Sequence, residues 1–169
     1  METTKETQKP AMKAEPQKEH EWLHKLIGDW TYESEASMGP DQPVEKVTGS
    51  ESVRSLGGIW VIAEGEGEMP GGGIGLSVMS LGYDSQNKRF VGTWIGSMMT
   101  NLWVSDGELN GETLTLNSEG PDWNSPGQMA NYRDVIEFKN DDHRTLTAHV
   151  QGTDGKWNEM MTVDYRRKK

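Results

Sequence analysis

The chain of 169 residues has no cysteine, which excludes disulfides, thiolate nucleophiles and thiolate metal sites. It also has no run approaching the roughly 20 apolar residues that a membrane helix needs, and its first residues lack the apolar core of a secretion signal. A net charge of −10 argues against non-specific binding to nucleic acid or to anionic membranes. We therefore expect a cytoplasmic protein that binds neither nucleic acid nor a membrane.

Leucine, isoleucine, valine and phenylalanine are scarce, and with the net charge this composition is typical of disordered chains. Seven tryptophans and ten methionines supply the missing apolar surface, because one buried tryptophan removes about 150–250 Å² from water. Residues 1–19 contain none of these aliphatic residues and no aromatic residue. The sequence therefore predicts a disordered polar tail over 1–19 and one folded domain over 20–169.

One short amphipathic helix is expected at 20–27, where the chain reads HEWLHKLI, and the rest is typical of strands. Segments rich in Val, Ile, Thr, Trp and Tyr alternate with turn clusters such as GPDQP, DSQNK and KNDD. These breaks leave eight to ten antiparallel strands, which must close into a barrel or fold as a sandwich. We predict an all-β, antiparallel up-and-down barrel.

The segment HEWLH at 20–24 matches H-E-x-x-H, in which two histidines hold zinc and the glutamate activates a water molecule. The third ligand that zinc hydrolases of this kind require is missing from the continuation. The other interpretation is a structural helix whose Leu23 and Leu26 face the core while its histidines lie at the solvent-facing margin. We favour this interpretation and assign no catalytic residue, no metal and no cofactor. A zinc-dependent hydrolase with His20 and His24 as ligands is the alternative.

Gly28-Asp29-Trp30, directly after the helix, resembles the G-x-W signature of lipocalins and their calycin relatives. In that family the tryptophan packs at the closed end of the barrel beneath an arginine of the last strand, for which Arg166 and Arg167 are the candidates. The strings HEWLHKLIGDW, ESVRSLGGIWVIAEGEGEMPGG and LGYDSQNKRFVGTWIGSMMTNLWVSDG resemble the bacterial family called domain of unknown function 1579. This resemblance implies a calycin-like barrel and no established activity.

Alternation along the strands turns one apolar face of each toward the barrel axis, and places the glutamates at 64, 66 and 68 in a solvated outer row. Small residues on the inner face leave space, and methionine provides a deformable lining. The interior is therefore predicted to bind a small hydrophobic or aromatic molecule. Trp123, in the irregular segment 117–128, either folds over the barrel mouth as a lid or packs on its own loop at the surface. The candidate ligand-binding residues are Tyr32, Met38, Ala63, Trp94, Met98, Trp103, Trp123, Met161 and Tyr165.

A filled interior is the remaining alternative, because large tryptophan and methionine side chains can also pack a barrel completely. The protein would then be a structural barrel that associates with itself, with a homodimer as the expected form.

Overall fold

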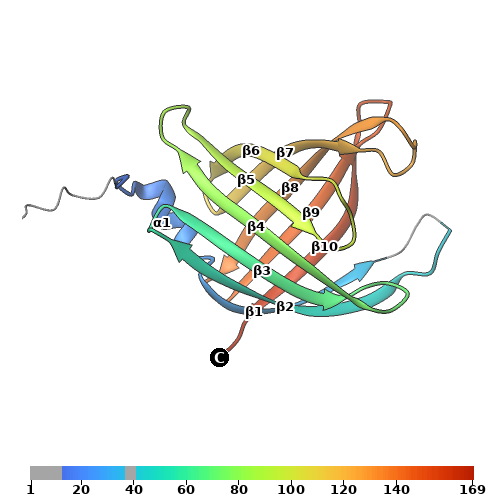
Figure 1. The fold of residues 1–169 in the computed structure, drawn as a ribbon, viewed down its shortest axis with the longest axis horizontal. Helices are drawn as coiled ribbons and strands as arrows, with labels where there is room; N and C mark the ends of the chain where they lie inside the picture. Colours follow the sequence, from blue (N-terminus) through green and yellow to red (C-terminus); the bar gives the residue numbers. More distant parts are fainter. Residues whose placement is uncertain (1–12, 37–40) are drawn as a thin grey trace, which may run out of the picture.

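The computed structural model describes residues 13–36 and 41–169. Within these residues, one helix precedes ten strands, which pair antiparallel in sequence order until β10 meets β1 and closes the barrel (Figure 1). The helix α1 spans Lys18–His24, and the strands are β1 (Gly28–Ala36), β2 (Glu45–Leu56), β3 (Trp60–Glu68), β4 (Ile74–Asp84), β5 (Arg89–Gly96), β6 (Trp103–Asn110), β7 (Thr113–Pro121), β8 (Met129–Asn140), β9 (His143–Gln151) and β10 (Trp157–Arg167). The predicted all-β antiparallel barrel is confirmed.

Two predicted boundaries differ from the structure. The helix begins at Lys18 and ends at His24, earlier at both ends than the expected 20–27. The irregular connection is shorter than the predicted 117–128 and spans 122–128, because β7 continues to Pro121 and pairs with β8 along its whole length. Of the predicted tail, residues 1–12 lie outside the described residues. The single described helix is too short and too polar to cross a membrane.

The two faces of the strands differ as the alternation predicts. In β3, Val61 and Ala63 are buried, whereas Glu64, Glu66 and Glu68 are exposed. The paired residues of β2 and β4 continue the same two faces, because directly opposed residues in an antiparallel pair share one side of the sheet. The three glutamates therefore form an outer row.

The hairpins divide between two ends of the barrel. The end that carries α1 (left in Figure 1) we call the closed end, and it also holds the β2–β3, β4–β5, β6–β7 and β8–β9 turns. The opposite end, the mouth, carries the β3–β4, β5–β6, β7–β8 and β9–β10 connections, which span 69–73, 97–102, 122–128 and 152–156. The helix covers only the closed end.

The apolar core fills the closed half of the barrel. Leu23 of the helix and Leu26 just after it are each 1 % exposed, and they pack in one cluster with Trp30. Phe138 contacts Trp22 and Trp30 edge-on, at ring-centroid distances of 5.7 and 6.3 Å. The helix therefore works as an apolar plug, as its Leu spacing predicts.

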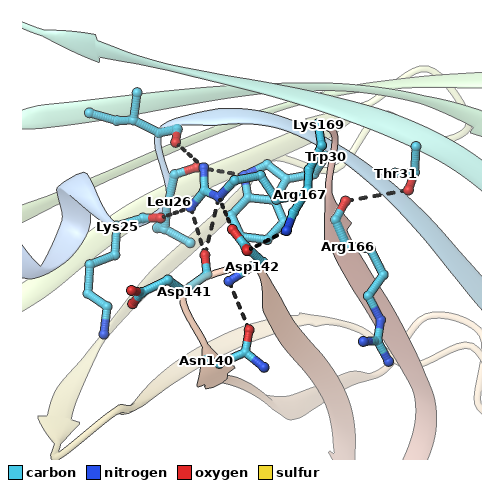
Figure 2. Close-up of polar contacts among 11 residues, drawn as sticks. Lys25, Leu26, Trp30, Thr31, Asn140, Asp141, Asp142, Arg166, Arg167 and Lys169 are labelled. Carbon is cyan, nitrogen blue, oxygen red and sulfur yellow. Dashed lines mark hydrogen bonds and ion pairs between the residues drawn. The ribbon is translucent and has the colours of Figure 1, made fainter.

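Arg167 fastens the end of β10 to this plug (Figure 2). Its guanidinium donates to the backbone carbonyls of Ile27 at 2.7 Å and Lys25 at 2.9 Å, and it lies 4.2 Å from the centroid of the Trp30 ring. Arg167 therefore takes the position that the lipocalin resemblance assigns to an arginine. Arg166 does not, because it is exposed on the outer face and pairs with Asp164.

Candidate functional site

The interior of the barrel changes character between its two ends. Most inward-facing residues near α1 are buried, whereas several in the mouth half, among them Met79, Trp94 and Trp103, keep part of their surface exposed to solvent. Pairing places them on one inner surface, since Trp94 lies opposite both Met79 and Trp103, and Ala148 lies opposite both Asp134 and Met161. We call this surface the mouth-half wall and define it by Tyr32, Met79, Trp94, Trp103, Asp134, Ala148, Val150 and Met161.

Aromatic rings of this wall lie over glycines rather than across the barrel. A methyl group at Gly67 would overlap the hydroxyl of Tyr32, and one at Gly120 would overlap the ring of Trp103. Trp94 covers Gly96 of its own strand in the same way. Because each ring uses the space that a missing side chain leaves at the wall, the rings extend along the wall and present their apolar faces inward.

Internal contacts hold two of these rings in place. Trp103 and Tyr132 meet edge-on with ring centroids 4.9 Å apart. The indole N–H of Trp103 points to the sulfur of Met99 at 3.1 Å, and the Tyr132 hydroxyl donates to the carbonyl of Pro121 at 2.5 Å. Since their polar atoms have partners within the protein, the rings offer chiefly apolar surface to a ligand.

Asp134 is the charged exception on this wall. It lies on β8 opposite Leu116 and Ala148, on the inward face that also holds Ile136. Its carboxylate accepts no hydrogen bond from any described residue, and burial raises its pKa to about 6, an effect that the nearby His149 partly offsets. Asp134 was not among the residues predicted from the sequence, although its spacing from Ile136 was a signal for an inward position.

An ion pair forms the floor of the mouth half. Arg144 of β9 is 1 % exposed and pairs with the carboxylate of Glu51 on β2, across the two strands β10 and β1 that lie between them in the barrel. Its guanidinium lies between two rings, 4.6 Å from the centroid of Trp30 and 3.8 Å from that of Tyr165. Burial also raises the pKa of Tyr165, which keeps that phenol neutral. No local sequence pattern indicates this pair, because its members lie on β2 and β9.

The sequence-predicted residues fall into three groups. The wall includes four of them, namely Tyr32, Trp94, Trp103 and Met161. Ala63 and Tyr165 also face inward but are buried among core residues. Met98 and Trp123 lie in mouth connections, 41 % and 56 % exposed, and Met38 lies outside the described residues.

Both histidines of HEWLH bind the protein itself. His20 Nε2 donates to the carbonyl of Tyr83 at 3.1 Å while its Nδ1 accepts the N–H of Gln17 at 2.9 Å, and His24 Nε2 donates to the carbonyl of Gly58 at 2.9 Å. His20 is 5 % exposed, so its expected place at the solvent margin was wrong. The described residues contain no group of three or more His, Cys, Asp or Glu side chains arranged to hold a metal ion.

A groove of about 590 Å³ lies outside the barrel, across β10, β1, β2, β3 and the start of β4. Most of its side chains belong to the outward-facing set, such as Glu33, Glu66, Asp164 and Arg166. Its charged side chains are already solvated by water, and its lining includes only two large apolar or aromatic side chains, those of Tyr32 and Ile74. The mouth-half wall, with its aromatic faces and its unpaired carboxylate, is therefore the stronger candidate for ligand binding.

The chain matches a known protein family in sequence and known β-barrels in structure. A family model described as "Protein of unknown function (DUF1579)" matches residues 15–167, and no curated protein matches the chain in sequence. The crystal structure of Rv2717c from M. tuberculosis matches with a TM-score of 0.60 at 10 % identity, covering 88 % of this chain and 96 % of that one. The structure of EF1p2_mFAP2b bound to DFHBI matches with a TM-score of 0.49 at 10 % identity, covering 88 % of this chain and 98 % of that one. At such identities the likeness to Rv2717c supports the barrel fold alone.

Because the pKa of Asp134 is raised, replacing its carboxyl group is expected to stabilise the folded protein by an amount that depends on pH. Its pKa is about 6 in the folded protein against 3.8 ordinarily, so the folded state binds the proton more tightly and its stability falls as pH rises between these values. Asp134→Asn is therefore expected to raise the free energy of unfolding by about 2 kcal/mol at pH 8, with little change at pH 3.5. Urea unfolding at both pH values measures this.

Glu137→Gln is the matched control, because it removes a carboxylate from the outer face of the same strand, where Glu137 pairs with Lys139. A gain from Asp134→Asn that is equal at the two pH values would contradict the assignment of the titration to Asp134.

Proposed function

Since the chain belongs to the DUF1579 family of proteins of unknown function, we infer its function from geometry and propose that it binds a small apolar or aromatic molecule inside the mouth half of its barrel. The observation that carries this proposal is the partial exposure of inward-facing aromatic and apolar side chains there, beside the fully buried core of the closed half. An apolar wall that is open to water favours binding of an apolar ligand, because binding removes apolar surface of both the wall and the ligand from water.

Three features of the wall support a binding role over a filled core. Small residues stand at inward positions of the mouth half, among them Gly65, Ser77 and Ala148. The rings of Trp94 and Trp103 lie over glycines at the wall, so they line the interior instead of filling it. A barrel of ten strands also has a wider interior than the eight-stranded barrels that side chains alone can fill.

Nile red, a neutral apolar dye, provides the test. Ala148→Trp adds an indole to the inner face of β9, whereas Thr147→Trp adds the same indole to the outer face of that strand. We expect the wild type to enhance the fluorescence of Nile red, Thr147→Trp to keep the wild-type affinity, and Ala148→Trp to lose about tenfold or more through steric overlap. Circular dichroism and thermal unfolding would verify that both variants fold.

Two results would refute an interior site. One is the absence of Nile red enhancement with the wild type. The other is an equal loss of affinity in the two tryptophan variants, which would place the dye on the outside of the barrel.

A further inference from the structure

Asp134 introduces an unbalanced charge into the mouth half. The other charged side chains on the inward faces of the described strands have partners. Glu51 and Arg144 pair with each other, Arg167 binds backbone carbonyls at the closed end, and Glu45 accepts a loop N–H at the rim. Asp134 alone faces the partly exposed interior with both carboxylate oxygens unbound by described residues.

The groups packed around Asp134 supply no compensating cation. Its partners in the sheet are Leu116 on β7 and Ala148 on β9. Neither side chain can form a hydrogen bond. The Tyr132 hydroxyl, on the same strand, is committed to a backbone carbonyl. His149 is the nearest titratable group, but it lies on the outward face of β9 and contacts the carbonyl of Arg133 at 3.3 Å.

A partly buried carboxylate without a partner destabilises the folded protein unless something pairs with it. The surroundings favour one kind of partner. The faces of Trp94 and Trp103 attract cations through their ring quadrupoles, and the net charge of −10 raises the local concentration of cations around the protein. Anions would meet the opposite field, and a neutral ligand would leave the charge of the carboxylate without a counter-ion.

Resting on the function proposed above, we propose that the natural ligand is an organic amine whose ammonium group binds Asp134 while its apolar or aromatic part packs on Trp94, Trp103 and Met161. The ammonium donates charge-assisted hydrogen bonds to the carboxylate, which are stronger than bonds between neutral groups. The aromatic wall covers the rest of the molecule. Asp134 is thus the residue that selects amines over neutral molecules of the same shape.

Two probes of nearly equal shape test the charge requirement, naphthylmethylamine, which is protonated from pH 5 to pH 8, and naphthylmethanol, which is neutral. Isothermal titration calorimetry at pH 8 is expected to show the amine binding about tenfold or more tightly than the alcohol. At pH 5 this preference should shrink, because Asp134 then carries a proton. Asp134→Asn should reduce the preference to less than about twofold while the alcohol binds as before.

Glu137→Gln again serves as the control, since it lowers the negative charge by the same amount from the outer face of β8 and should keep the full preference for the amine. Equal binding of the two probes by the wild type would overturn the amine assignment and leave the interior site intact. A preference that survives in Asp134→Asn would also overturn it, because the net charge would then be its cause. If neither probe binds, the amine assignment fails, and Nile red decides separately whether the interior site exists.

Discussion

Replacing Arg144 with methionine is expected to lower the free energy of unfolding by about 3–5 kcal/mol, because the change leaves the carboxylate of Glu51 buried without its partner. Arg144 is the one charged side chain among the largest fully buried side chains of the described residues, and its guanidinium also contacts the rings of Trp30 and Tyr165. The variant therefore loses two cation–π contacts together with the ion pair. Urea unfolding followed by tryptophan fluorescence measures the loss.

Adding Glu51→Gln to Arg144→Met should restore part of the lost stability, because the double variant no longer buries an unpaired charge. Arg166→Met is the matched control, since Arg166 pairs with Asp164 on the exposed face and should cost less than about 1 kcal/mol. A loss below 1 kcal/mol for Arg144→Met would show that the pair does not support the fold.

Trp30→Ala is expected to cost a similar 3–5 kcal/mol, because it removes the largest fully buried side chain of the described residues and leaves a cavity. Trp30 is 0 % exposed, its indole N–H donates to the carbonyl of Leu26 at 2.8 Å, and Arg144 and Arg167 both lie over its ring. Trp30, on the first strand, thus joins the turn after the helix to the last two strands. Thermal unfolding would show the effect as a lower midpoint.

Trp123→Ala is the control for tryptophan removal, since Trp123 is largely exposed in the 122–128 connection and should cost less than about 0.5 kcal/mol. Similar losses for the two variants would contradict the assignment of the core to the closed end.

The fold was predictable because strand signals are local. Turn clusters set the number of strands, and the period of two assigned Tyr32 and the outer glutamates to their faces. The faces of 91–104 were ambiguous, since Ile95 and Val104 are apolar yet exposed on the outer side. Pairing with Met79 on β4 places Trp94 inside.

The polar features of the interior were not predictable in this way. Glu51 and Arg144 meet only because barrel closure pairs β1 with β10 and so brings β2 near β9, and their sequence separation of 93 residues carries no local pattern. His20 is buried for a similar reason, since its partner is the carbonyl of Tyr83, 63 residues away. Asp134 differs, because its inward position followed from alternation, but an acidic residue in a strand is usually interpreted as solvent-facing.

Binding of a ligand between the walls of the mouth half is tested most directly by NMR. The indole N–H signals of the seven tryptophans report which part of the barrel the ligand contacts. In ¹H–¹⁵N spectra, assigned with single Trp→Phe variants, saturation with Nile red is expected to shift the signals of Trp94 and Trp103. The signals of Trp30 in the closed-end core and of Trp60 at the outer start of β3 should stay in place. Shifts confined to Trp60 or to other tryptophans outside the wall, with Trp94 and Trp103 unchanged, would contradict the account.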